Sequence, residues 1–154
     1  MKLESLVKTY TKFQETSIRG IQPEGWLRAY LETQRNGLTG NMEVGQWPFD
    51  TDGWAGPDPI EITNPDYKGN RWIPYESTAY MVDGMIRCGH LLNDSYLIEK
   101  AKKHIDYVLE HPDSDGYLGP NLLKENRWWY RWPHAVFFRA LAAHHSATGC
   151  SSST

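Results

Sequence analysis

Hydrophobic residues recur with a helical period in four segments of the chain. Apolar side chains at intervals of three and four residues predict helices over residues 23–36, 77–92, 95–110 and 132–148, and a shorter, weaker helix over residues 4–14. No segment favours a strand as clearly, although residues 38–73 have room for a small hairpin. The positions expected to face inward are Trp26, Leu27, Tyr30, Leu31, Val82, Met85, Ile86, Gly89, Leu97, Ile98, Ala101, Ile105, Val108, Leu109, Val136, Phe137, Ala140 and Leu141.

The ends of these segments carry residues typical of helix termini. Pro23 and Pro133 occupy first-turn positions, Ser77 is a suitable N-cap, and Gly149 follows the last segment. Only Asn93-Asp94 separates the second and third segments. Because so short a connection leaves neighbouring helices antiparallel, these two segments predict an αα-hairpin.

A nine-residue motif occurs twice in the chain. Residues 50–58 are D-T-D-G-W-A-G-P-D and residues 113–121 are D-S-D-G-Y-L-G-P-N. Each copy follows a helix and leads towards the next one. This alternation is typical of a toroid, in which αα-hairpins surround an axis and equivalent loops gather at one end. The sequence therefore predicts an all-α fold built from αα-hairpins.

The residue types of the motif favour a structural turn. Its Asp side chains accept hydrogen bonds from nearby backbone N–H groups, and its glycines allow positive φ. The D-x-D-G string also resembles the start of a calcium loop, but neither copy has the remaining ligands or the distal Glu. Only the rings of Trp54 and Tyr117 are left for another role.

Composition and charge exclude several classes of protein. The chain has 154 residues, 40% of them hydrophobic and 23% charged, which fits one folded domain rather than a disordered segment. Apolar runs of only a few residues exclude a transmembrane helix, so no membrane partner is expected. A net charge of −3 with scattered Lys and Arg argues against nucleic acid. The N-terminal residues lack the apolar core of a signal peptide, so the chain as given fits the cytoplasm, but its compartment stays unknown. An upstream segment would open the periplasmic or secreted alternatives.

Aromatic side chains are abundant and concentrate in the connections between helices. They make up 13% of the chain and include seven Trp. A carbohydrate site needs an aromatic face against the C–H side of a sugar and polar groups for its hydroxyls. The loop residues that supply this set, and that we predict as substrate contacts, are Trp54, Trp72, Glu76, Trp129 and His134.

Each of these residues also has a purely structural interpretation. A single Trp is more often packed between helices than bound to a ligand, and Glu76 ahead of a helix is favoured by the helix dipole. Asp83 is expected to be either buried and paired or exposed. The histidines are interpreted as solvated or satisfied side chains, and Cys150 as a tail residue. The sequence thus predicts no catalytic residue and no metal ligand.

Several stretches together resemble the N-terminal part of the β-L-arabinofuranosidase-like glycoside hydrolases, glycoside hydrolase family 127 and its relatives. The similarity spans about residues 18–149, and the order and spacing of its motifs are more specific than any one of them. These are, in order, Gly25-Trp26-Leu27, residues 32–40, the D-G-W-x-G turn at 52–56, Pro74-Tyr75-Glu76, residues 80–84, residues 102–109, residues 115–120, Trp132-Pro133 and Ala147-Thr148-Gly149.

The resemblance implies a catalytic (α/α)6 barrel and a retaining mechanism. In that family a cysteine thiolate is the nucleophile within a zinc site of three cysteines and a glutamate, and another glutamate is the acid/base. All of these lie downstream of the region of similarity. We therefore expect residues 1–149 to form an incomplete portion of the barrel, followed by a low-complexity tail at 150–154. We expect this chain to hold no cofactor and to be inactive alone, whereas the full-length family holds zinc.

Two other functions stay open at this stage. The aromatic loops would also suit a module that binds carbohydrate without cleaving it. Alternatively, an open toroid exposes the apolar sides of its outer hairpins, which favours self-association. Carbohydrate is the expected partner of a hydrolase fragment and of a carbohydrate-binding module. A second copy of the chain is the expected partner of a self-associating module.

Overall fold

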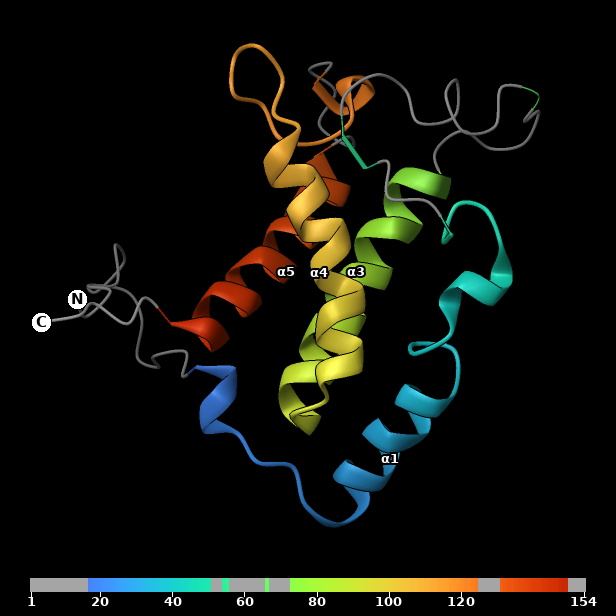
Figure 1. The fold of residues 1–154 in the computed structure, drawn as a ribbon, viewed down its shortest axis with the longest axis vertical. Helices are drawn as coiled ribbons and strands as arrows, with labels where there is room; N and C mark the ends of the chain where they lie inside the picture. Colours follow the sequence, from blue (N-terminus) through green and yellow to red (C-terminus); the bar gives the residue numbers. More distant parts are fainter. Residues whose placement is uncertain (1–16, 51–53, 56–65, 67–72, 125–130, 150–154) are drawn as a thin grey trace, which may run out of the picture.

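The computed structural model describes residues 17–50, 54, 55, 66, 73–124 and 131–149. Within these residues the fold is all-α, with four α-helices packed against each other and no strand (Figure 1). These residues also form three short 3-10 helices: η1 (Ile18–Gly20) precedes the first α-helix, and η2 (Met42–Gly45) and η3 (Asn121–Lys124) lie in connections between α-helices. The α-helices are α1 (Gly25–Asn36), α3 (Ile73–Leu92), α4 (Ser95–Glu110) and α5 (Arg131–Thr148).

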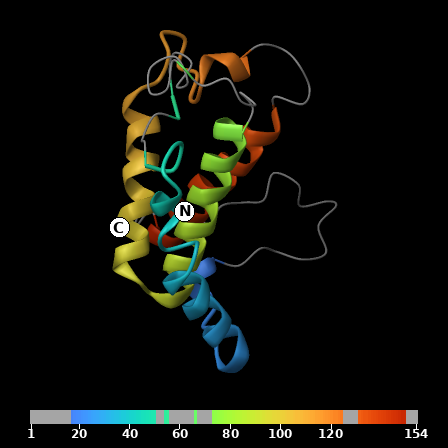
Figure 2. The same ribbon diagram turned by 90° about the vertical axis from the view of Figure 1, so that its right-hand side faces the viewer.

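Helix α3 is the centre of this arrangement. It packs against α1, α4 and α5, and the turned view shows α3 beside α5 (Figure 2). Because three helices cover it, its apolar residues are buried on more than one side, including Ala79, Val82, Met85 and Ile86. The predicted stripe of this segment is therefore confirmed as core.

Helices α3 and α4 form the predicted antiparallel hairpin. Asn93 turns the chain with a positive φ of 55°, and Asp94 caps α4 by accepting a hydrogen bond from the Leu97 backbone N at 3.0 Å. Gly89 lets the helices approach closely, since a Cβ there would lie 2.9 Å from Ile98 Cγ1. The short connection and the missing side chain together fix the hairpin.

A buried carboxylate joins α3 to α5. Asp83 is only 4% exposed and accepts a hydrogen bond from Arg87 at 2.7 Å and another from Arg139 Nε at 3.1 Å. The carboxylate lies on α3 and Arg139 on α5, so the cluster ties the two helices together. Of the two alternatives for Asp83, the structure shows the buried and paired one.

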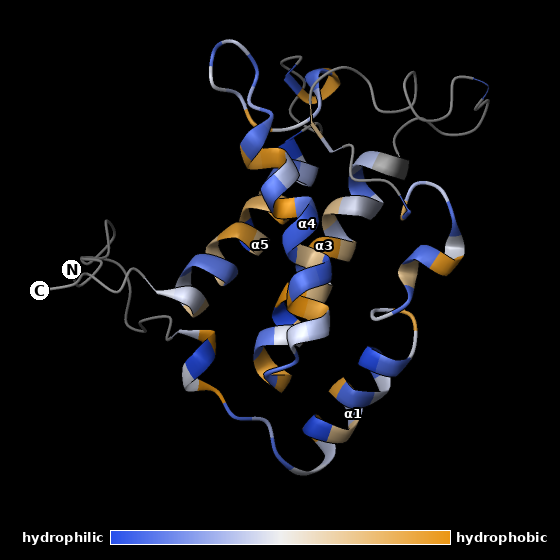
Figure 3. Ribbon diagram, viewed as in Figure 1, coloured by the Kyte–Doolittle hydropathy of each residue, from blue (hydrophilic) through white to orange (hydrophobic). Residues whose placement is uncertain are grey.

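The predicted inward face of residues 23–36 is wrong. No residue of α1 is buried, and Trp26 and Tyr30 are 79% and 55% exposed. Figure 3 shows hydrophilic and hydrophobic residues alternating along this helix, which packs mainly on α3. An apolar face is buried only where a partner covers it, and within the described residues α3 covers only the side of α1 that carries Leu31.

Other boundaries differ in smaller ways. Helix α3 begins at Ile73, four residues before the predicted cap at Ser77, because Pro74 is compatible with a first helical turn. Helices α4 and α5 match their predicted ranges within one residue, although Leu109 is exposed. Residues 4–14, residues 150–154 and much of 38–73 lie outside the described residues. The described part of 38–50 contains η2 and no strand.

Candidate functional site

The first copy of the repeated motif contributes a ring to the core. Trp54 is 1% exposed, and its indole stacks on Phe137 of α5 with ring centroids 4.3 Å apart. Its Nε1 donates a hydrogen bond to the backbone O of Tyr75 at 2.8 Å, in the first turn of α3. Trp54 therefore packs between the starts of α3 and α5, and its ring is not exposed for a sugar in this arrangement.

The second copy forms a closed turn. The Asp113 and Gly116 backbone N–H groups donate to Tyr117 O and Asp113 O, each at 2.8 Å, and Gly116 has a φ of 83°. Lys124 Nζ pairs with both Asp113 and Asp115, at 2.8 and 2.6 Å. These pairs lower the pKa of both carboxyls. The carboxylates thus hold the turn and a lysine, as a structural turn requires.

The two copies meet across the end of the helices. A Cβ on Gly119 of the second copy would lie 3.0 Å from Trp54 Cζ3 of the first and 2.8 Å from His134 Nε2. His134 Nε2 is itself 2.7 Å from Leu118 O, so this nitrogen carries the proton that it donates to the carbonyl. Burial lowers the pKa of His134. The glycine of one motif is therefore required by the ring of the other.

The predicted site residues come together only in part. Trp54 and His134 lie side by side, with ring centroids 5.3 Å apart, and both pack against the second motif copy. Glu76 is half-buried in the first turn of α3 rather than ahead of the helix, because α3 starts earlier than predicted. Trp72 and Trp129 lie outside the described residues. For Trp72, Glu76, Trp129 and His134 the role as substrate contacts stays a prediction, whereas the buried ring of Trp54 is left out of the proposed contacts.

Tyr80 and Trp132 form an exposed aromatic pair that sequence reasoning did not single out. Trp132 Nε1 donates to Tyr80 Oη at 2.8 Å, and the two residues are 55% and 42% exposed. Trp132 lies in the first turn of α5 and Tyr80 in the first half of α3. Arg139 lies near Tyr80 and is held by Asp83. No local pattern pairs residues 52 positions apart, so only the packing of α3 on α5 creates this pair.

Tyr117, the other motif ring, carries a buried hydroxyl. Within the described residues its Oη has no hydrogen-bond partner, and burial raises the pKa of this phenol to about 12. The ring lies 5.0 Å from the His134 ring, between centroids. The Tyr117 ring therefore packs beside His134 of α5 rather than facing solvent freely.

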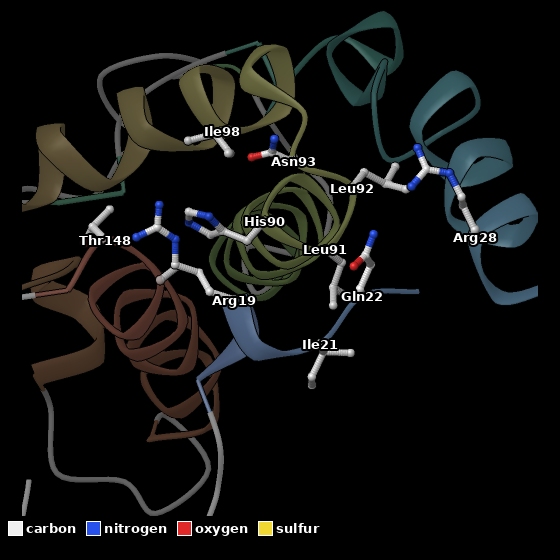
Figure 4. Close-up of a pocket in the computed structure, with 11 residues that line it drawn as sticks. Arg19, Ile21, Gln22, Arg28, His90, Leu91, Leu92, Asn93, Ile98 and Thr148 are labelled. Carbon is white, nitrogen blue, oxygen red and sulfur yellow. The ribbon is translucent and has the colours of Figure 1, made fainter. Parts of the chain in front are cut away.

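A concave pocket of about 410 Å³ lies at the opposite end of the bundle (Figure 4). His90 of α3 lines this pocket, and its Nε2 is 3.1 Å from His144 Nδ1 of α5. Burial and the neighbouring imidazole lower the pKa of His90, and burial lowers the pKa of His144. No local pattern pairs these two histidines, because they lie on different helices.

The family resemblance places the zinc ligands downstream of the region of similarity, not among the described residues. In the described part of the chain, no three His, Cys, Asp or Glu side chains are arranged to hold a metal ion. Cys88 is buried with its Sγ 3.6 Å from Leu31 O, and burial raises the pKa of its thiol. A thiolate ligand requires the opposite environment.

The chain was compared with protein-family models, curated proteins and solved structures, and none of them matches it. None of the helices in the described residues combines the length and apolar character needed to cross a lipid bilayer.

Proposed function

We propose that this chain is the N-terminal part of a β-L-arabinofuranosidase-like glycoside hydrolase and contributes sugar-facing loops to an incomplete (α/α)6 barrel. The observation that carries the proposal is the meeting of the two motif copies through Trp54, Gly119 and His134. Equivalent loops that gather at one end of the helices are what a toroid of αα-hairpins requires.

The exposed groups at this end suit a carbohydrate. A sugar ring stacks its C–H side on Trp132, which the hydrogen bond to Tyr80 holds in place. Because Tyr80 Oη accepts the indole N–H, its own proton is available to a sugar hydroxyl. The half-buried Glu76 lies at the same helix end. Trp132 and Tyr80 thus join Trp72, Glu76, Trp129 and His134 as the proposed substrate contacts.

The chain alone is proposed to bind sugar without cleaving it. The family's retaining mechanism uses a zinc-bound cysteine, which the resemblance places downstream of the region of similarity. No catalytic step is therefore assigned to residues of this chain. Zinc supplies the thiolate chemistry only in the full-length family.

Intrinsic fluorescence titrated with L-arabino-oligosaccharides tests this function. We expect saturable binding with no release of arabinose in the presence of zinc. The substitution Trp132→Ala should weaken sugar binding about tenfold or more, because it removes the aromatic surface that the sugar would bury on binding. Trp26→Ala is the matched control, since Trp26 is more exposed and lies on α1. Absence of saturable binding contradicts the proposal, and zinc-dependent turnover contradicts its non-catalytic part.

Self-association is the second candidate, and the exposed face of α1 favours it. Trp26 and Tyr30 lie one helical turn apart, and Val44 of η2 is 78% exposed. Apolar patches of this kind mark association surfaces. Light scattering should show a fraction of dimer that rises with protein concentration. Trp26→Ser should lower this fraction, and Leu109→Ser, which changes an exposed apolar residue of α4, should leave it unchanged. A monomer at every concentration contradicts this candidate.

A further inference from the structure

The pocket at the end opposite the motif loops has the size of a small-molecule site. Its volume of about 410 Å³ falls in the range of about 300–1,000 Å³ that is usual for ligand pockets. The C-terminal turns of α3 and α5 form one side of it, and the chain from η1 to α1 forms the other. Figure 4 shows Arg19 and Arg28 on opposite sides of the C-terminal end of α3.

The lining is positively charged although the chain as a whole is negative. Arg19 and Arg28 both belong to it, and no Asp or Glu does. Arg19 forms no ion pair with any residue that the structure describes. Arg28 pairs with Glu32 through Nε at 2.8 Å, and both side chains are about half-exposed. Such an exposed pair is weak, so the guanidinium remains able to bind an anion.

Several carbonyl groups at the C-terminal ends of α3 and α5 have hydrogen-bond partners other than the two arginines. Helix C-termini attract cations through their unpaired carbonyl groups. Here several of these carbonyls already accept hydrogen bonds, so the arginines are not needed to satisfy them. The occupied carbonyls and their donors are His90 O with Asn93 N, Gly89 O with Asp94 N, His144 O with Thr148 Oγ1, His145 O with Gly149 N, and Ser146 O with Ser17 Oγ.

The two arginines lie at different sides of the pocket. Figure 4 shows Arg19 next to His90 and Thr148, and Arg28 on the far side next to Leu92. Leu91 and Gln22 lie between them. The pocket thus presents a positive group, a partly apolar middle and a second positive group.

We propose that this pocket binds a small linear dicarboxylate, with one carboxylate at Arg19, the other at Arg28 and the carbon chain over Leu91. Guanidinium groups suit carboxylates because their N–H groups match the two oxygens. Two carboxylates also balance the two formal charges of the lining, whereas two phosphate groups would carry an excess of negative charge. This site is separate from the carbohydrate contacts proposed above and does not depend on them.

Calorimetric titration with succinate, glutarate and adipate tests the proposal, with propionate as the one-carboxylate comparison at equal ionic strength. At least one dicarboxylate should bind about tenfold more tightly than propionate, since a second charged hydrogen-bonded contact is made. Arg19→Gln and Arg28→Gln should each lower the affinity for that dicarboxylate to the affinity for propionate. Lys103→Gln, a change of the same charge on the exposed side of α4, should leave the affinity unchanged.

The result that overturns the proposal is equal affinity for propionate and all three dicarboxylates, or an Arg19→Gln variant that keeps the full preference. Backbone amide shifts in the wild-type chain provide a readout that needs no variant. Saturable shifts at residues 90–93 and 148 on addition of the preferred dicarboxylate support the site, and shifts confined elsewhere contradict it. Arg19→Lys distinguishes charge from fork geometry and should retain part of the preference.

Discussion

Replacing Gly119 by alanine tests whether the two motif copies are locked together. The residue has a φ of 120°, and an added Cβ would lie 2.8 Å from His134 Nε2 and 3.0 Å from Trp54 Cζ3. Neither ring can move freely, because Trp54 stacks on Phe137 and His134 is hydrogen-bonded to Leu118 O. The substitution must therefore strain the backbone and overpack the core at the same time.

The expected cost follows from these two effects. A side chain at such a φ costs about 1–3 kcal/mol, and overpacking a buried site costs about 1–3 kcal/mol more. Their sum of about 2–6 kcal/mol is a large part of the stability of a domain, which is about 5–15 kcal/mol. Gly116→Ala is the matched control, since Gly116 has a φ of 83° but no atom within 4 Å of an added Cβ. That variant should show the backbone cost alone.

Urea unfolding followed by far-ultraviolet circular dichroism measures both variants. We expect Gly119→Ala to lower the free energy of unfolding more than Gly116→Ala by about 1–3 kcal/mol. In a His134→Ala background the cost of Gly119→Ala should fall, because one of the two clashing rings is gone. Equal effects of the two glycine substitutions, or a cost that His134→Ala does not change, would refute the steric argument.

Three further predictions concern other parts of the structure. The pKa values of His90 and His144 are lowered in the folded state. Below about pH 6.5 the unfolded chain therefore binds more protons than the folded chain, which favours unfolding. Thermal melts should show stability falling as the pH drops through this range. A His144→Gln variant whose stability falls with decreasing pH as steeply as that of the wild-type chain would contradict the assignment of this pH dependence to the two histidines. Asp83→Asn should lower the free energy of unfolding by about 1–3 kcal/mol in urea titrations, because two arginines lose a charged acceptor. No change would show that the cluster adds nothing. Trp54→Phe should cost about 1–3 kcal/mol, because it removes the hydrogen bond from the indole N–H to Tyr75 O and leaves part of a buried site unfilled, whereas an unchanged unfolding midpoint would argue against both effects.

The sequence determined the helices and the hairpin of this protein by itself. The spacing of apolar residues predicted α4 and α5 within one residue, and Asn93-Asp94 predicted the turn between α3 and α4. These features are local, because a helix needs only a periodic apolar face and suitable termini, and two residues allow only an antiparallel connection. The repeat of the D-x-D-G turn was likewise visible in the sequence alone.

Only the tertiary structure decided which apolar faces and polar groups find partners. The periodicity of residues 23–36 could not show that Trp26 stays exposed, because burial depends on a second element. Trp54 seemed available for a sugar because a loop position carries no sign of depth, yet it lies in the core. The Tyr80–Trp132 and His90–His144 pairs join α3 to α5 across more than 50 residues. Contacts of this kind arise from helix packing, which the order of residues along one chain segment does not encode.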